Sequence, residues 1–178
     1  MRIRPYIPAK DYEAIEKWID NERTHVLWCA NLLPYPITQK SFHAFLEKEA
    51  IDWNDSAYIA TEDNGTPVGF FCYSLNTEDS VGFLKFILVD PASRGAGYGK
   101  KMLRLALQYA FWITGAEAVQ LNVFRENLPA RRCYEKAGFA ERKVEQDIFS
   151  YQDETWSRCN MIVRKETTPT GDVRFEPA

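Results

Sequence analysis

The middle of the chain carries a glycine-rich segment with the residue types of a phosphate-binding loop. Residues 83–99 read Phe-Leu-Lys-Phe-Ile-Leu-Val-Asp-Pro-Ala-Ser-Arg-Gly-Ala-Gly-Tyr-Gly, an order that predicts a strand, a sharp turn, a loop and the start of a helix. Backbone N–H groups at the start of a helix lack a partner in the helix, and the helix dipole makes that end positive. Arg94 adds a fixed positive charge beside the loop. We therefore expect the chain to bind a phosphorylated cofactor here.

Two common phosphate-binding loops do not fit this segment. The loop of nucleotide triphosphatases needs a Ser or Thr after Gly-Lys, but Lys101 follows here and Arg94 occupies the position of the first glycine. The dinucleotide fingerprint is Gly-x-Gly-x-x-Gly. Begun at Gly95 it ends on Lys100, and begun two residues later it ends on Met102. Both interpretations fail because the residues are out of register.

The pattern that fits is Arg-x-x-Gly-x-Gly, formed by Arg94, Gly97 and Gly99 directly after the predicted strand. It resembles the motif with which the GNAT superfamily of N-acetyltransferases binds acetyl-coenzyme A (acetyl-CoA). Glycines before a helix can also form a plain turn. The loop alone therefore leaves both interpretations open.

A second motif lies further along the chain. An alternating segment, residues 119–124, precedes Arg-Glu-Asn-Leu-Pro-Ala-Arg-Arg-Cys-Tyr-Glu-Lys-Ala-Gly-Phe. This resembles the downstream GNAT motif, in which an Asn, an Ala, a Tyr and a Gly-Phe pair recur on a short helix. The matching residues here are Asn127, Ala130, Tyr134, Gly138 and Phe139. Two motifs in the family's order favour the GNAT interpretation over a plain turn, and the resemblance covers roughly residues 57–163.

The first third of the chain matches the family only loosely. Asp11, Trp18 and the segment from Trp28 to Pro34-Tyr35 resemble the branch that acetylates protein N-terminal amines, including those of ribosomal proteins. Enzymes acting on polyamines, amino acids and aminoglycosides belong to the same branch. The resemblance thus implies a small-molecule or peptide amine as acceptor, and the sequence does not choose among these amines.

The resemblance implies one α+β domain over residues 1–164, followed by a loose C-terminal tail over residues 165–178. In the GNAT fold a mixed, mostly antiparallel sheet of about seven strands is flanked by about four helices. Strands near residues 81–89 and 118–124 would run parallel and then splay apart. Acetyl-CoA would enter the gap between them from the side of the glycine loop.

The resemblance also implies which residues hold acetyl-CoA. The amides of residues 95–100 would bind its pyrophosphate, and its pantetheine arm would pair with the backbone of Leu88 and Val89 as an added strand does. Asn127 would bond the pantetheine arm or cap a helix, and the sequence does not separate these roles. The expected cofactor-binding residues are Leu88, Val89, Arg94, Gly95, Ala96, Gly97, Tyr98, Gly99, Lys100 and Asn127.

The expected reaction is direct attack of a neutral amine on the thioester within a ternary complex. A backbone amide near Val89 would stabilise the oxyanion, and Tyr134 would protonate the departing thiolate. Some members of the family use a glutamate on the strand before the glycine loop, but residues 83–89 contain no acid. His25 and His43 lie outside both motifs. No general base is therefore assigned.

Two interpretations without catalysis remain open. The chain could be an acyl-CoA sensor that has lost turnover, although it retains Tyr134. It could also be a structural α/β module whose glycine loop is accidental. Release of the CoA thiol would distinguish the first from an enzyme, and thermal stabilisation by CoA would exclude the second.

Periodicity and turn signals predict the elements that position these residues. Strands are expected at residues 2–7, 57–61, 67–75, 81–89 and 118–124, and a closing pair at 139–149 and 155–163. Helices are expected at residues 11–20, from Thr38 onward, at 97–114 and around Tyr134. Aromatic residues of the first helices and the closing hairpin are candidate walls of the acceptor site, although most of them are expected to pack in the core: Trp28, Tyr35, Phe42, Trp53, Phe149, Tyr151 and Trp156.

Composition agrees with a small globular enzyme. The chain has 178 residues, of which 46% are hydrophobic, and a formal net charge of −3, which argues against a dedicated nucleic-acid partner. Apolar runs are too short to span a bilayer. The four cysteines lack metal-binding spacing, so we expect no metal and a reduced, cytoplasmic protein without membrane association. Members of the superfamily often form homodimers, which the resemblance also suggests.

Overall fold

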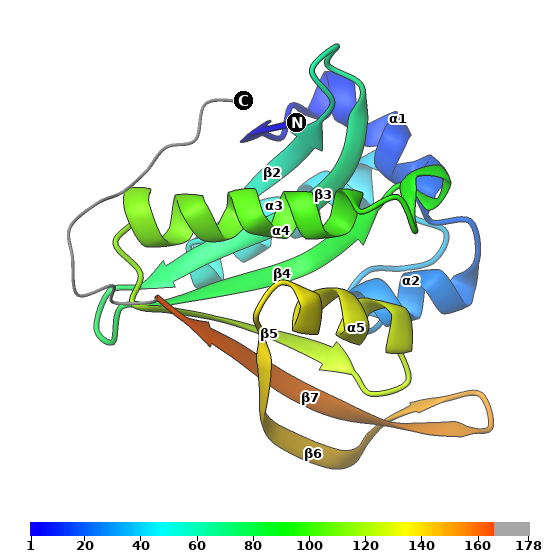
Figure 1. Cartoon of the computed structure of the whole chain (residues 1–178). Coiled ribbons are helices and arrows are strands. Elements are labelled where there is room, and N and C mark those ends of the chain that lie inside the picture. Colours follow the sequence, from blue (N-terminus) through cyan, green and yellow to red (C-terminus); the bar gives the residue numbers. More distant parts are fainter. Residues whose placement is uncertain (166–178) are drawn as a thin grey trace.

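The computed structural model describes residues 1–165, which form one seven-stranded sheet with helices on both faces (Figure 1). The strand order is β1-β2-β3-β4-β5-β7-β6, and every neighbouring pair is antiparallel except β4 and β5. This confirms the predicted mixed, mostly antiparallel sheet. The strands are β1 (Arg2–Pro5), β2 (Ser56–Thr61), β3 (Pro67–Asn76), β4 (Val81–Val89), β5 (Ala118–Phe124), β6 (Ala140–Tyr151) and β7 (Glu154–Arg164).

The parallel pair β4 and β5 separates after only half of its length. Pairing runs from Val81 opposite Ala118 to Leu84 opposite Leu121, whereas β4 continues to Val89 and β5 to Phe124. The predicted splay between the two strands is thereby confirmed. Beyond Leu84 the β5-facing edge of β4 lacks a strand partner, which leaves backbone groups available to another molecule.

Three helices cover one face of the sheet and two cover the other (Figure 1). The first group packs with β2, β3 and β4 in one apolar cluster, and the second packs over β4 and β5 in another. The helices are α1 (Pro8–Trp18), α2 (Glu22–Cys29), α3 (Gln39–Trp53), α4 (Tyr98–Gln108) and α5 (Leu128–Lys136). The sheet therefore separates these two cores, and a smaller apolar cluster joins Val26 of α2 to Phe124, Tyr151 and Trp156.

Helix α2 was not predicted from the sequence, which indicated about four helices. It has eight residues, of which only His25, Val26 and Cys29 are buried. Two of these are not strongly apolar residue types, so the helical hydrophobic period is weak. Its start is nevertheless well defined, because the side chain of Asn21 accepts a hydrogen bond from the amide of Thr24.

Helix α4 follows the expected pattern and carries the glycine loop at its beginning. It buries Met102, Leu103, Ala106 and Leu107 and continues as a π-helical turn η2 (Tyr109–Ile113). Gly115 then takes a positive φ of 78°, a backbone conformation that commonly ends a helix. The helix thus runs close to the predicted limits of residues 97–114.

The remaining boundaries differ little from the expectation. The side chain of Thr38 caps α3, as predicted, in a capping box with Ser41. Strands β6 and β7 are slightly longer than expected and meet at a turn at Gln152 and Asp153. Of the expected loose tail, only Lys165 lies within the described residues.

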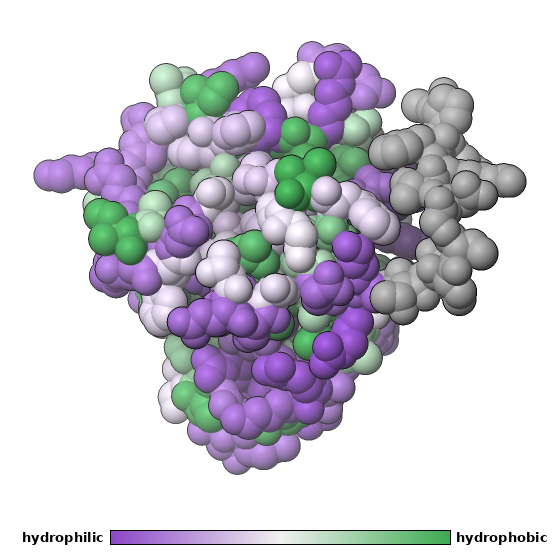
Figure 2. Space-filling model, turned by 90° about the vertical axis from the view of Figure 1, so that its left-hand side faces the viewer, coloured by the Kyte–Doolittle hydropathy of each residue, from purple (hydrophilic) through white to green (hydrophobic). Residues whose placement is uncertain are grey.

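On the face seen in Figure 2, hydrophobic residues form separate spots among hydrophilic ones, and the lower part is mostly hydrophilic. The large apolar side chains are mainly enclosed in the two cores. Within residues 1–165, the helices are too short or too polar to cross a bilayer.

Candidate active site

The glycine loop presents a run of unpaired backbone amides. The N–H groups of residues 95–100 make no hydrogen bond with any residue in the range 1–165, and the first helical bond runs from the amide of Lys101 to the carbonyl of Gly97 at 3.0 Å. Gly95 and Gly97 have positive φ values of 78° and 84°. A Cβ built on either would meet no protein atom within 4 Å. The loop is therefore an open cradle of donors at a helix N-terminus, which suits a pyrophosphate.

A short turn fixes the loop to the end of β4. Asp90 precedes the 3-10 turn η1 (Pro91–Ser93), and its carboxylate accepts a hydrogen bond from the amide of Ala92 at 3.0 Å. Arg94 follows, exposed, with its Nε donating to the carbonyl of Val89 at 3.3 Å. A guanidinium thus lies beside the expected pantetheine segment. Lys100 is also exposed at the start of α4.

The second glycine of the motif, Gly99, has a packing role that the sequence expectation did not include. A Cβ at Gly99 would lie 3.0 Å from Sγ of Cys133 and 3.5 Å from Val89. A side chain there would crowd the Cys133 thiol of α5, which would have to shift. Gly99 therefore allows the helix that carries Tyr134 to approach the loop.

Tyr134 lies on α5 with only 7% of its surface exposed. Its ring packs against Phe139, with ring centroids 6.2 Å apart. Its hydroxyl makes no hydrogen bond within residues 1–165, and part of the surface of this oxygen remains accessible. Burial, together with the nearby Cys133 thiol, raises the pKa of Tyr134. The phenol therefore stays protonated at neutral pH, as a proton donor must.

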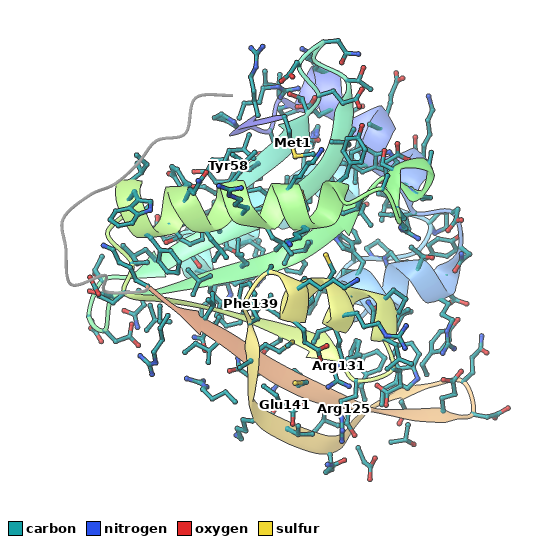
Figure 3. All side chains as sticks on the ribbon, viewed as in Figure 1. Met1, Tyr58, Arg125, Arg131, Phe139 and Glu141 are labelled. Carbon is teal, nitrogen blue, oxygen red and sulfur yellow. The ribbon has the colours of Figure 1, made fainter. Side chains whose placement is uncertain are left out.

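An ion pair holds α5 against the closing hairpin. Nη2 of Arg131 lies 3.3 Å from a carboxylate oxygen of Glu141 on β6, and Figure 3 shows these two side chains facing each other below α5. Phe139, at the turn between α5 and β6, packs in the same core as Tyr134. Both contacts restrict the position of the Tyr134 ring.

Asn127 caps α5, which is one of the two roles left open by the sequence. Its Oδ1 accepts a hydrogen bond from the amide of Ala130 at 3.3 Å. Its Nδ2 makes no hydrogen bond within residues 1–165. The cap therefore leaves one donor of this side chain for a ligand.

A buried charge cluster lies against β4 where the sequence indicated only a lysine. Nζ of Lys85 is 2.9 Å from a carboxylate oxygen of Asp55 and 3.5 Å from one of Glu49. Burial raises the pKa of Glu49 despite the opposing effect of Lys85. The sequence did not predict this cluster because its carboxylates lie far from Lys85 along the chain. Glu49 is on α3, and Asp55 follows shortly after that helix. Lys85 balances part of this negative charge, while the oxygens of Asp55 are buried without a hydrogen-bond partner within residues 1–165.

Beside this cluster is a pocket of about 330 Å³ between α3 and the sheet. It includes Tyr6, whose hydroxyl lies 3.0 Å from Nε2 of His43. His25 is fully buried in α2, where burial lowers its pKa and keeps it neutral. Neither histidine is next to the glycine loop.

The candidate acceptor aromatics divide into core and accessible residues. Phe42 and Trp156 are fully buried, and Tyr151 is 8% exposed. The surfaces of these three side chains are used in packing, so they belong to the core. Those with accessible surface are Trp28, Tyr35, Trp53 and Phe149. Residues 1–165 contain no cluster of three His, Cys, Asp or Glu side chains suited to a metal ion.

No sequence pattern predicted the contact between α2 and β4. Nε1 of Trp28 donates a hydrogen bond of 2.8 Å to the carbonyl of Phe86. Phe86 has a positive φ of 50° and lies just beyond the last pair between β4 and β5. The contact joins α2 to the strand edge that the expected cofactor would use.

Comparison with known proteins places this geometry in a family context. A sequence model of the acetyltransferase (GNAT) family matches residues 11–139. An uncharacterised N-acetyltransferase of Methanocaldococcus jannaschii is 30% identical over 115 residues, covering 62% of this chain and 50% of that protein. Mycothiol acetyltransferase of Actinosynnema mirum is 31% identical over 99 residues, or 55% of this chain and 33% of that protein.

A spermine/spermidine N(1)-acetyltransferase of Bacillus subtilis is 30% identical over 81 residues, covering 42% of this chain and 53% of that protein. The chain thus spans about half or less of the length of these curated relatives. The crystal structure of spermidine N-acetyltransferase from Vibrio cholerae in complex with CoA and spermine has a TM-score of 0.76 at 19% identity. That match covers 92% of this chain and 94% of the other, and it shows a shared fold.

The family match extends over both motifs and over more than half of the chain. The seven-stranded sheet, its splayed parallel pair and the open glycine loop agree with it. The chain belongs to the acetyltransferase (GNAT) family.

Proposed function

We propose that this protein transfers an acetyl group from acetyl-CoA to a primary amine. The observation that carries the proposal is the run of unpaired amides at residues 95–100, which leads into α4 next to the splayed end of β4. Family membership supports the same chemistry. The amine attacks the thioester directly within a ternary complex.

The loop residues bind the diphosphate in this proposal. The amides of residues 95–100 donate to its oxygens, and Arg94 and Lys100 supply positive charge at the surface. Because a Cβ would enter open space at Gly95 and Gly97, the backbone there can approach an anion closely. The residues present therefore fit this part of CoA.

The unpaired edge of β4 binds the pantetheine arm. The backbone at Leu88 and Val89 pairs with the arm as with a neighbouring strand, through the groups that face away from β3, since β5 has diverged by this point. Nδ2 of Asn127 supplies one more donor from the opposite side of the gap. These contacts direct the thioester toward the inner end of the opening.

The backbone amide near Val89 stabilises the oxyanion that forms when the amine attacks. A preorganised donor of this kind typically contributes about 3–4 kcal/mol to the transition state. The amine attacks in its neutral form and its nitrogen then loses a proton to water. Tyr134 gives its proton to the sulfur as the carbon–sulfur bond breaks and regains one from solvent. The raised pKa keeps Tyr134 protonated until the thiolate forms.

We propose a small primary amine as acceptor, with polyamines as the first class to test. Proteins named for spermine or spermidine acetylation are among the relatives and structural neighbours. Mycothiol acetyltransferases are among the relatives as well. The N-terminal amine of a peptide, which the sequence resemblance implied, stays a second candidate acceptor. Homodimer formation also stays a prediction.

A panel of amines tests the proposal. Spermidine, spermine, single amino acids and short peptides with free N-terminal amines are incubated with the protein and acetyl-CoA. We expect one class to release CoA thiol and to gain an acetyl group by mass spectrometry. If CoA raises the melting temperature but every amine in the panel stays unmodified, the acyl-CoA sensor interpretation replaces this one.

A further inference from the structure

Strand β4 contains a bulge where it separates from β5. Opposite β3 the register changes between Phe70, which faces Leu88, and Cys72, which faces Lys85. One residue of β3 therefore opposes two of β4. Phe86 occupies the bulge with a φ of 50°, a backbone region that bulky side chains rarely adopt. Neighbouring structure must hold this residue in place.

Trp28 of α2 supplies such a restraint. Its indole N–H donates to the carbonyl of Phe86 at 2.8 Å. The indole itself is held between aromatic rings, with centroids 6.1 Å from Phe42 and 6.4 Å from Phe70. The donor is therefore a rigid group from a helix that lies far from β4 in the sequence.

The position of the bulge gives this hydrogen bond a consequence for the proposed chemistry. Leu84 is the last residue of β4 that pairs with β5. The bulge lies between Leu84 and the segment Leu88–Val89. Successive residues of a strand direct their amides to alternate sides. A bulge that shifted or straightened would therefore turn the Val89 amide away from the side it now faces.

We propose that Trp28 is a positioning residue for acetyl transfer: its indole N–H fixes the Phe86 bulge and thereby aims the backbone that stabilises the oxyanion. This inference rests on the proposed function. Trp28 acts through the strand and does not touch the reacting atoms. It affects the rate of the chemical step more than the binding of the diphosphate, which the separate loop at residues 95–100 provides.

The test compares two tryptophan-to-phenylalanine variants. Trp28→Phe removes the indole donor but keeps an aromatic ring, and Trp18→Phe is the control. Trp18 is 5% exposed in the same apolar cluster and makes no hydrogen bond to another residue in the range 1–165. Kinetics use acetyl-CoA with spermidine, or with the amine of the panel that is acetylated. Amide hydrogen exchange of residues 85–89 is measured in parallel.

We expect Trp28→Phe to lower kcat about tenfold, part of the loss seen when an oxyanion donor is removed outright. The Kd of CoA should stay within about twofold, since the loop is untouched. Exchange at residues 85–89 should become faster in Trp28→Phe and not in Trp18→Phe. If Trp28→Phe fails to fold, benzothienylalanine at position 28 replaces it, because sulfur removes the N–H while the ring shape is retained.

Equal effects of the two substitutions on kcat and exchange would overturn the positioning role, because simple packing would then explain both. A protein that acetylates nothing in the panel would instead refute the proposed function. In that case exchange still shows whether Trp28 holds the bulge, so the two failures are distinguishable.

Discussion

At the scale of single residues, the chemistry depends on one buried phenol and one run of amides. Tyr134 is enclosed by its core, but its hydroxyl is unpaired within the described range. Because this hydroxyl keeps some accessible surface, a ligand atom can reach it, as the proposed proton donation requires.

We predict that Tyr134→Phe lowers kcat about 100-fold while the Kd of CoA changes little, because general acid catalysis typically contributes that much or more. Steady-state kinetics and calorimetry measure the two quantities. Tyr73→Phe is the matched control, since Tyr73 is 4% exposed in the same core. Undiminished turnover in Tyr134→Phe would remove the acid assignment.

Motif residues could be predicted from the sequence, because Arg94, Gly97, Asn127 and Tyr134 belong to short patterns with local geometry. Partners from distant elements could not. Trp28 reaches Phe86 across 58 positions, and no local spacing connects them. The pairing of Lys85 with Asp55 is equally invisible before the fold is known.

At the scale of elements, the loop before α4 owes its shape to left-handed glycines. Gly97 has a φ of 84° and open space around its Cα, so a side chain there meets no protein clash. The cost of a substitution comes instead from the backbone conformation and from filling the cradle.

Gly97→Val is therefore expected to weaken CoA binding by at least about tenfold, because a β-branched residue strongly disfavours this conformation. Isothermal calorimetry with CoA measures the effect. Ala96→Val in the same loop is the control, since Ala96 is not among the residues with positive φ. Comparable Kd values for wild type and Gly97→Val would place the diphosphate elsewhere.

Helices and strands with a strong hydrophobic period could also be predicted, whereas those with a weak period could not. The apolar residues of α4 recur at helical spacing and predict a helix. The pair Asn64-Gly65 predicts the hairpin between β2 and β3. Helix α2 was missed because its buried side includes His25 and Cys29. The bulge at Phe86 was missed because its sequence reads as a continuous apolar strand.

At the scale of the whole molecule, an ion pair joins the beginning of the chain to its first helix. Arg4 on β1 binds both carboxylate oxygens of Asp11 on α1, at 2.7 and 2.6 Å, and Asp11 is fully buried. Burial favours the neutral form of Asp11, but the hydrogen bonds from Arg4 and from the amide of Ile7 outweigh it and hold its pKa below the usual range.

A carboxyl with a lowered folded-state pKa stabilises the protein above its unfolded pKa, and this contribution is lost as pH falls. Asp11→Asn should therefore cost about 3–5 kcal/mol at neutral pH, as expected for a broken buried pair. Its stability should also fall less than that of wild type between about pH 5 and about pH 3. Chemical denaturation across this range measures both effects.

Exposed Asp153 provides the control, as Asp153→Asn should leave the pH profile unchanged. A second carboxyl adds to the acid sensitivity of wild type: hydrogen bonds from Arg23 and Trp156 lower the pKa of Glu154 to about 2. Parallel profiles for wild type and Asp11→Asn would contradict the assigned role of the Arg4–Asp11 pair.

The short contact between β4 and β5 has a mechanical consequence. Only four parallel residue pairs, from Val81–Ala118 to Leu84–Leu121, join a four-stranded unit to a three-stranded one. Bending of the sheet concentrates at this seam, because widening it beyond Leu84 breaks no ladder bond. A molecule that bridges both strands there would act as a brace, so occupancy of the gap would stiffen the sheet from end to end.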